Sequence, residues 1–489
     1  MNRERMSGVD TAWLRMDSPA NLMMIVGVWV FETPMARERL LARLRERLLV
    51  FDRFRQVVRT DATGAWWVDD PAFDLDHHVV NARLPRPGGA RGLQRLAARL
   101  AAQPLPPGRP LWQFHLVEQY DGASALVTRI HHCIADGIAL VKVMLSMSDD
   151  GAAASPRRRA RAMPAGGEGH EDLARSLMAA IEPVGRTAVR VLGQAGGSVA
   201  RAAGEGDAGQ FAQWAAAGLR LAQDAMSIAL MTEDSRTRFK GKPGRRKAVA
   251  WNEPLPIDEV KAVCRALGVS VNDVLLSCVA GALRRYLAER GDATEGVELR
   301  AMVPVNLRPP QQEARLGNRF GLVPLVLPVG IANPLARLRE VRRRMDELKG
   351  GFQAPLAYAL LSAIGQAPRA LQSGVRDYLS HKSSAVMTNV PGPAEPIRIV
   401  GNTVRRVMFW VPQSGDIGLG VSILSYRGGV QFGVMTDAGL CPDPQRIIDG
   451  FAPEFERLLL TLALVPPDVL RDDDAPAQIE QRLLGMPAA

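Results

Sequence analysis

The sequence has few cysteines, no long apolar run and few aromatic residues. Its four cysteines form no CxxC pair and are too few for a disulfide framework, which indicates a reducing environment and argues against a small secreted protein. The longest apolar stretches, 22–31 and 458–465, fall well short of the ~20 residues that a spanning helix needs. The opening residues show no apolar signal segment, so a cytoplasmic location is expected.

Lysine is also scarce, although the chain is basic. The 61 basic residues outnumber the 51 acidic ones, giving a formal charge of +10, and almost all of the basic residues are arginines spread along the whole chain. With 5% aromatic residues and no recognition helix, zinc finger or RNA-binding aromatic pair, nucleic acid is not expected as a partner. A positive surface also suits anionic lipid or the phosphates of a nucleotide-bearing substrate.

The length of 489 residues and the 47% hydrophobic content predict a large globular protein of two or three domains. Short β-like runs alternate with helical patterns, which favours an α/β fold. We expect an N-terminal domain at 1–150, a linker and helical connector at 151–240, and a C-terminal domain at 241–489. The predicted strands are 22–32, 124–130, 297–305, 322–329, 385–389, 416–426 and 430–436, and the predicted helices are 36–54, 137–147, 256–267 and 271–289.

The segment 149–172 is rich in Ala, Gly, Pro and Arg and has almost nothing to bury, so it predicts a flexible linker or surface excursion. Its role is not evident from the sequence. Residues 173–235 have an Ala-rich helical pattern broken by glycines around 196–209, which favours a helical connector over a membrane-binding hairpin.

The sharpest chemical signal is HHCIADG at 131–137, at a predicted strand-to-helix turn. Adjacent residues of a strand point to opposite faces, so only one of His131 and His132 can face a given cavity. A neutral imidazole can take a proton from a hydroxyl and later return it to a leaving group. Asp136 could orient a histidine or pair with an arginine, and Gly137 allows close backbone approach at the helix start.

Other kinds of site are less well supported by the sequence. Adjacent histidines often bind metal or merely pack, but no other His or Cys has ligand spacing with this pair, so no metal is expected. The second pair, His77 and His78, has no Asp-Gly after it and is interpreted as structural. No GxSxG, Walker or GxGxxG motif is present, which favours direct transfer to an acceptor without a covalent enzyme intermediate.

Several stretches in order along the chain resemble the bacterial wax ester synthase/diacylglycerol acyltransferase family, within the chloramphenicol acetyltransferase-like superfamily. HHxxxDG alone is shared with peptide-synthetase condensation domains, and the further stretches narrow the resemblance. The matching stretches are SGVDTAWLRMDSP at 7–19, FDLDHHV at 73–79, RPLW at 109–112, HHCIADG at 131–137, VNDVLL at 271–276, VPVNLR at 303–308, GNRFG at 317–321 and TNVPGP at 388–393.

The resemblance implies two chloramphenicol acetyltransferase-like domains, each a mixed sheet with packed helices, and a substrate tunnel at their interface. Acyl-CoA would enter from one side as co-substrate, with no other cofactor, and a fatty alcohol or diacylglycerol from the other. The products would be wax esters and triacylglycerol. By the same resemblance His132 is the general base, while His131 and Asp136 hold the geometry of the motif. We further expect Asp136 to pair with Arg308.

The remaining motif residues have structural interpretations beside the functional ones. Pro110, Leu111 and Trp112 match the PLW stretch and could pack beneath the catalytic strand or contact substrate. Asn272 and Asp273 match the ND motif at a helix start, where side-chain oxygens cap backbone N–H groups. The turn around NVPGP is interpreted as architectural rather than chemical.

Two alternatives remain open from the sequence. One is a condensation-type acyltransferase with a different donor or acceptor, and the other is a non-catalytic lipid-binding protein that coats storage inclusions. Because the acceptors partition into bilayers, contact with the inner membrane face or with lipid inclusions is expected to be peripheral. Chain-length preference, the ratio of wax ester to triacylglycerol and the oligomeric state are not encoded in any motif.

Overall fold

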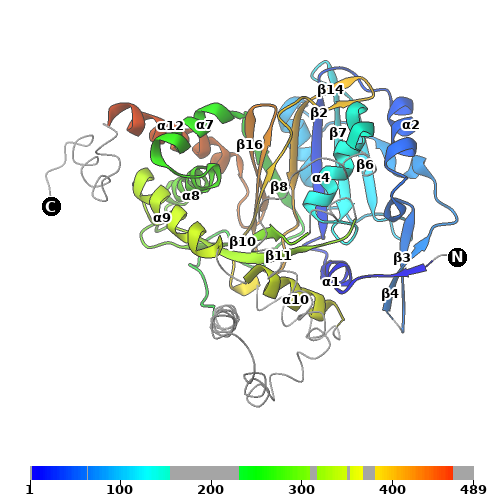
Figure 1. The fold of residues 1–489 in the computed structure, drawn as a ribbon, viewed down its shortest axis with the longest axis horizontal. Coiled ribbons are helices and arrows are strands. Elements are labelled where there is room, and N and C mark those ends of the chain that lie inside the picture. The colour runs from blue at the N-terminus through cyan, green and yellow to red at the C-terminus, as the bar shows by residue number, and fades with distance from the viewer. Residues whose placement is uncertain are drawn as a thin grey trace, which may run out of the picture.

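The fold is described from a computed structural model that covers residues 3–62, 64–154, 231–308, 316–349, 353–366 and 380–465. Two large mixed sheets lie next to each other, and helices pack on their outer faces (Figure 1). A small third sheet projects beside the N-terminal half, in the order β1 (Arg3–Arg5), β4 (Gly64–Asp69) and β3 (Gln56–Asp61).

The first large sheet has six strands and takes two of them from the C-terminal half of the chain. In spatial order the strands are β13 (Arg398–Ile399), β14 (Asn402–Trp410), β2 (Met24–Phe31), β7 (Ala123–His131), β6 (Trp112–Tyr120) and β5 (Val79–Asn81). Strand β14 pairs antiparallel with β2 from Val404 opposite Phe31 to Trp410 opposite Val26. The sheet is therefore complete only when the distant C-terminal strands are in place.

All eight residues of β2 are buried because both faces of this sheet are covered, the outer face by helices and the inner face by a helix together with the second sheet. Side chains alternate between the two faces of a strand. Ile25, Trp29 and Phe31 belong to one core, together with α2 (Arg37–Arg47) and α4 (Gly137–Ser146), while the valines between them belong to another core with α3 (Gly89–Ala101). This burial explains the continuous apolar run at 22–31, and the strand predicted there is present.

The second large sheet has seven strands and forms the C-terminal half. The order is β11 (Phe320–Leu327), β10 (Leu299–Asn306), β12 (Ala385–Pro391), β15 (Leu419–Tyr426), β16 (Gly429–Asp437) and β8 (Lys247–Trp251), with β9 (Leu255–Pro256) also paired to β16. Strand β12 lies parallel to both β10 and β15, and the other pairs are antiparallel.

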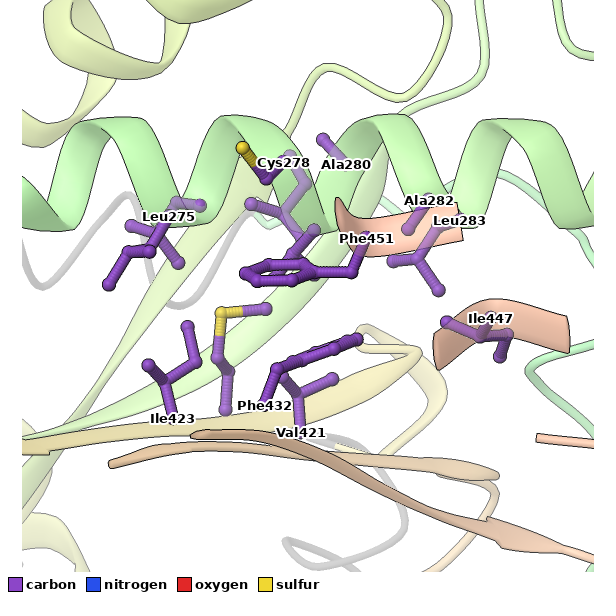
Figure 2. Close-up of a cluster of buried hydrophobic side chains, with 14 of the residues drawn as sticks. Leu275, Cys278, Ala280, Ala282, Leu283, Val421, Ile423, Phe432, Ile447 and Phe451 are labelled. Atoms are coloured by element: carbon purple, nitrogen blue, oxygen red, sulfur yellow. The ribbon is translucent and has the colours of Figure 1, made fainter. Parts of the chain in front are cut away.

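Helices on the outer face of this sheet bury a large core. They are α7 (Ile257–Leu267), α8 (Val271–Glu289), α9 (Pro334–Lys349) and α12 (Gln445–Leu464). Figure 2 shows α8 above the sheet, with Phe451 of α12 stacked on Phe432 of β16 at a ring-centroid distance of 4.3 Å. Complete burial of each ring stabilises the fold by about 1.5–3 kcal/mol. Helix α8 begins with a capping box between Ser270 and Asp273.

The inner junction between the two halves is also apolar. Trp251 of β8 and Trp410 of β14 lie 5.8 Å apart in a core that includes Val28 and Met435. The two sheets therefore share side-chain packing, and the two halves of the chain both contribute strands to the first sheet. The predicted division into domains at 1–150 and 241–489 stays a prediction. Strands β13 and β14 come from the C-terminal half of the chain but lie in the sheet of the N-terminal half.

The predicted strands and helices outside the connector are present, most with ends shifted by one to three residues. The helix predicted over 36–54 is shorter, because α2 ends at Arg47 and a separate 3₁₀ helix follows at Asp52–Phe54. The linker was predicted to begin at Asp149, but Asp149–Ala154 is a 3₁₀ helix. Asp149 accepts hydrogen bonds from Arg43 and from the backbone of Val400 and Gly401, which fixes this segment. The remainder of the linker and residues 155–230 lie outside the described residues, and 231–235 are not helical.

Among the described helices, none is long and apolar enough to cross a membrane by itself. The pair α7 and α8 reaches the required length and composition only together, across a bend of 103°.

Candidate active site

The turn after the central strand β7 brings the HHCIADG motif to the boundary between the two halves. His132 follows the last strand residue, and its backbone N–H donates to the Met23 carbonyl at 2.7 Å. Trp13 of α1 (Gly8–Met16) stacks on the imidazole at 4.1 Å, and Phe320 of β11 lies 5.6 Å away. The ring is therefore held between an N-terminal helix and a C-terminal strand, and the His132 residue is only 4% exposed.

Hydrogen bonds to Asn318 fix the orientation of the His132 ring. The amide nitrogen of Asn318 donates to the Asp10 carboxylate at 2.8 Å and to the backbone oxygen of His132 at 2.7 Å. Its Oδ1 lies 2.9 Å from Nδ1 of His132. Because Asn318 Oδ1 can only accept, the hydrogen of the neutral imidazole is on Nδ1 and the lone pair is on Nε2.

Burial lowers the pKa of His132 to about 4, and its hydrogen bond with Asn318 and the charge of Asp136 raise it only in part. The ring is therefore neutral at pH 7, which is the form that can accept a proton. Among the described residues, Nε2 of His132 has no hydrogen-bond partner. Burial also raises the pKa of Asp10, the carboxyl that holds Asn318.

His132 lines a cavity of about 1020 Å³ between the two halves, which is large enough for an extended lipid substrate. The N-terminal wall includes Trp13, Asp136 and Gly137. The C-terminal wall consists largely of apolar and uncharged polar residues: Met302, Pro304, Asn306, Phe320, Leu322, Leu361, Ser380, Val386, Thr388, Asn389, Val390, Phe409, Val411, Pro412, Ser414 and Ile417. The cavity matches the expected position of a substrate tunnel at the interface.

The predicted pair between Asp136 and Arg308 is present, with Nη2 of Arg308 2.8 Å from Oδ2 of Asp136. The same carboxylate oxygen accepts from the backbone N–H of Arg319 at 3.0 Å, and the other oxygen caps α4 by accepting from Ala139 at 2.8 Å. Asp136 therefore connects the start of α4 to the C-terminal half.

Gly137 lines the cavity, and a Cβ placed on it would meet no atom within 4 Å. The absence of a side chain at this position leaves open space beside the motif.

His131 points away from the cavity and lies in packing. Its Nδ1 accepts from the backbone N–H of Cys133 at 3.1 Å, and its Nε2 is 3.8 Å from Asp17. The prediction that only one of the two histidines faces a cavity is confirmed. The second pair is also structural, since His78 stacks on Trp112 at 4.4 Å and His77 pairs with Asp74 at the surface.

The PLW residues lie beneath the motif and do not line the cavity. Trp112 is fully buried and donates from its indole N–H to the Phe54 carbonyl at 2.9 Å. The carbonyl of Leu111 accepts from the backbone N–H of His131 at 2.9 Å, and the carbonyl of Pro110 accepts from Trp112 at 2.8 Å. These contacts favour the packing interpretation.

The ND residues contact the cavity only indirectly. Asp273 caps α8, as expected for a carboxylate at that position. The side chain of Asn272 accepts from Asn389 at 2.6 Å, and Asn389 lines the cavity. Asn272 therefore helps to orient a wall residue.

Gly392 of the NVPGP turn packs so closely against the next strand that a Cβ on it would lie 2.3 Å from the Ser425 carbonyl oxygen. This close packing agrees with the architectural interpretation of the turn.

Four residues at this site were not named by the sequence analysis: Asp10, Trp13, Asn318 and Thr388. Three of them contact or orient His132, as described above. Thr388 lines the cavity, is 3% exposed, and its buried hydroxyl has no hydrogen-bond partner in the part of the chain that the structure describes. All four lie in stretches that carry the family resemblance, and this resemblance is the sequence signal that could have identified them as site residues. Nothing local in these stretches indicates which side chain faces His132.

Within the described ranges, no group of three or more His, Cys, Asp or Glu side chains is arranged to hold a metal ion. The expectation that the site works without metal stays a prediction.

Comparison with protein families identifies both halves of the chain. Residues 6–275 match the model of the wax ester synthase/diacylglycerol acyltransferase catalytic domain, and residues 316–459 match the model of the WS/DGAT C-terminal domain. Among curated proteins, the probable diacylglycerol O-acyltransferase tgs1 of Mycobacterium tuberculosis H37Rv is 31% identical over 433 residues, covering 86% of this chain and 88% of the relative. The probable diacylglycerol O-acyltransferase tgs2 of the same organism is 30% identical and covers 90% and 95%.

Solved structures share the fold. A wax ester synthase/diacylglycerol acyltransferase from Marinobacter aquaeolei VT8 aligns with a TM-score of 0.63 and 21% identity, covering 94% of this chain and all of that one. The first condensation domain of the calcium-dependent antibiotic synthetase aligns with a TM-score of 0.57 and 15% identity, covering 95% and 99%. The observed fold therefore agrees with the two-lobed, mixed α/β architecture that the sequence predicted.

Proposed function

This chain belongs to the wax ester synthase/diacylglycerol acyltransferase family and is an acyltransferase, and from this membership we propose that it transfers an acyl group from acyl-CoA with His132 as general base. The acceptor hydroxyl is that of a long-chain alcohol or of diacylglycerol, so the products are wax esters and triacylglycerol. The observation that carries the proposal is a neutral imidazole with a free Nε2 on the wall of a large, mostly apolar cavity.

In the proposed reaction, Nε2 of His132 accepts the proton of the acceptor hydroxyl as its oxygen attacks the thioester carbonyl carbon. The tetrahedral intermediate then breaks its C–S bond, and the imidazolium returns the proton to the sulfur of the departing thiol. Asn318 supports both steps because its Oδ1 keeps the ring in one orientation and accepts from Nδ1 in the neutral and charged forms.

We assign the stabilisation of the oxyanion of that intermediate to the hydroxyl of Thr388. It is buried in the wall of the cavity that His132 also lines, and it has no hydrogen-bond partner among the described residues, so no existing bond must break before it donates. Preorganised donors of this kind contribute about 3–4 kcal/mol to transition-state stabilisation. Because the serine and cysteine nucleophile motifs are absent, the acyl group passes directly to the acceptor.

The test is an assay with purified protein. Palmitoyl-CoA together with hexadecanol or a diacylglycerol should release free thiol and form ester, which thin-layer chromatography detects. His132→Ala should lower the rate by at least about 100-fold, since general-base catalysis contributes 10²–10⁴. His78→Ala is a control for loss of a buried histidine outside the cavity. Full activity of the His132 variant, or inactivity of the intact protein with every alcohol tried, would count against the proposal.

We also propose that the protein contacts membranes only peripherally, which the formal charge of +10 favours for anionic surfaces. Sedimentation with phosphatidylcholine vesicles that contain phosphatidylglycerol should show binding that weakens as salt is raised. Binding that is indifferent to lipid charge and to salt would contradict the electrostatic form of this proposal.

A further inference from the structure

A basic loop, KGKPGRRK at 240–247, lies against one edge of the cavity and has no part in the proposed chemistry. Lys240 forms a backbone bridge with Ile417, and the N–H of Gly241 donates to the Asp416 carbonyl at 3.1 Å. Ile417 and Ser414 line the cavity. The loop is therefore attached by backbone hydrogen bonds to a segment that forms the cavity wall.

The cavity approaches the surface at this edge. Ser414 lines the cavity and is partly exposed, as are the next two residues of the chain. His381, which follows the wall residue Ser380, has a side chain that is 56% exposed. The edge of the cavity near Ser414 therefore borders both the basic loop and residues that are exposed to solvent.

The acidic groups around the loop already have partners. Asp234 pairs with Lys240 at 2.8 Å, and the buried Asp437 pairs with Lys247 at 3.3 Å. Asp437 also accepts from the backbone N–H of Gly244 at 2.8 Å, which holds the tip of the loop.

The third carboxylate, Asp416, lies 3.2 Å from Nε2 of His381. Three exposed basic side chains remain on the loop, those of Lys242, Arg245 and Arg246. None of the three forms an ion pair with a described residue, so their positive charges are available to a ligand.

We infer that Lys242, Arg245 and Arg246 bind the phosphates of the CoA donor and that the donor enters the cavity at this edge. This inference rests on the proposed function and adds the site that recognises the nucleotide end of the donor. Arginine binds phosphate oxygens through paired N–H groups, and such charge-assisted bonds are stronger than neutral ones. An acyl-CoA has its phosphates at one end and its apolar acyl chain at the other, with the reacting thioester between them, as the basic edge and the apolar cavity require.

The phosphate of an anionic lipid has the same chemistry, and the test must separate the two sources. Two donors with the same acyl chain are compared, palmitoyl-CoA and S-palmitoyl-N-acetylcysteamine, which has no phosphate. In Arg245→Ala/Arg246→Ala the KM for palmitoyl-CoA should rise about tenfold, the effect of losing about 1.4 kcal/mol of binding. The ratio of kcat/KM between the two donors should shift by the same factor toward the phosphate-free donor.

The matched control is Arg45→Ala/Arg265→Ala, which removes the same charge from two exposed arginines. Neither arginine is on the basic loop: Arg45 is on α2 and Arg265 is on α7. Helix α7 follows β9, which pairs with β16 at Gly429 and Val430, whereas the loop is held at the other end of β16 by Asp437. This variant should keep the wild-type ratio between donors. Equal effects on both donors in the loop variant, or an equal shift in the control, would overturn the inference.

Two further measurements do not depend on turnover. Calorimetric titration with CoA itself should give an affinity about tenfold weaker in the loop variant, which tests the phosphate site even if the catalytic proposal fails. Sedimentation with phosphatidylglycerol vesicles tests the lipid alternative. Loss of vesicle binding in the loop variant with unchanged CoA affinity would assign the cluster to lipid and contradict the inference.

Discussion

At the scale of single residues, the side-chain amide of Asn318 determines which nitrogen of His132 can act. Both hydrogens of the amide are used, one by Asp10 and one by the backbone of His132, so its oxygen must face the ring. A positioning residue of this kind acts through the histidine and does not contact substrate. Trp13 restricts the ring from one face by stacking.

Replacing Asn318 by Ala should therefore lower kcat by about 10- to 100-fold, the usual effect of losing a group that orients a functional histidine. The KM for both substrates should change little, because the apolar walls remain. Steady-state kinetics with circular dichroism as a check on folding tests this expectation. A rise in KM alone would show that Asn318 serves substrate binding and not ring orientation.

Thr388→Val removes a hydroxyl at nearly constant shape and should lower kcat by about 100-fold, the effect of losing one oxyanion donor. Thr388→Ser keeps the hydroxyl and is the matched control, which should retain most of the activity. Both are measured with palmitoyl-CoA and hexadecanol at saturation. Equal activity of the valine and serine variants would exclude the hydroxyl from the reaction.

The pH dependence follows from the pKa of His132, which burial lowers to about 4. The neutral ring is the active base, so kcat/KM should rise as pH increases through about 4 and should be flat from pH 6 to 7. A pH–rate profile over the range in which the fold persists gives this value. An acid limb near 6.5 would instead indicate a solvated imidazole.

At the scale of elements, α4 is joined to the C-terminal half through Asp136. Its carboxylate caps the helix and accepts from both Arg308 and the backbone of Arg319. The joint is buried, with Asp136 and Arg308 5% and 7% exposed. Removing one member of such a pair leaves the other charge buried and uncompensated.

Asp136→Asn should therefore lower the free energy of unfolding by about 3–5 kcal/mol, the usual cost of breaking a buried pair. Urea denaturation followed by tryptophan fluorescence measures this change. Asp150→Asn is the control, because Asp150 is exposed and has no ion pair among the described residues. If both variants have the same stability, the pair does not hold the helix.

Elements whose signal is local could be predicted from the sequence. The strand-to-helix turn of HHCIADG and the capping of α8 by Asp273 are determined by neighbouring residues, and both are present. The partners of His132 could not be predicted, because Asn318 lies 186 positions away and only the folded chain brings the two together. The same reason applies to β14, whose pairing with β2 has no local pattern.

At the scale of the whole molecule, two features connect the halves: the C-terminal strand β14 pairs with β2, and a shared core surrounds Trp251 and Trp410. Both should make the two halves unfold together. Scanning calorimetry should then show one transition with equal calorimetric and van't Hoff enthalpies. Gel filtration of the sample before and after the scan controls for aggregation. Two separated transitions would mean that each half is stable without the other.

The pairing of β14 with β2 has a further consequence during synthesis. Between the end of β2 at Phe31 and the start of β14 at Asn402, the ribosome must add 370 residues. At about 5–20 residues per second this takes roughly 20–75 s. From the synthesis of β7, which pairs with β2, until β14 emerges, the nascent N-terminal sheet exposes an open, valine-rich edge, where a chaperone or another nascent chain could attach first.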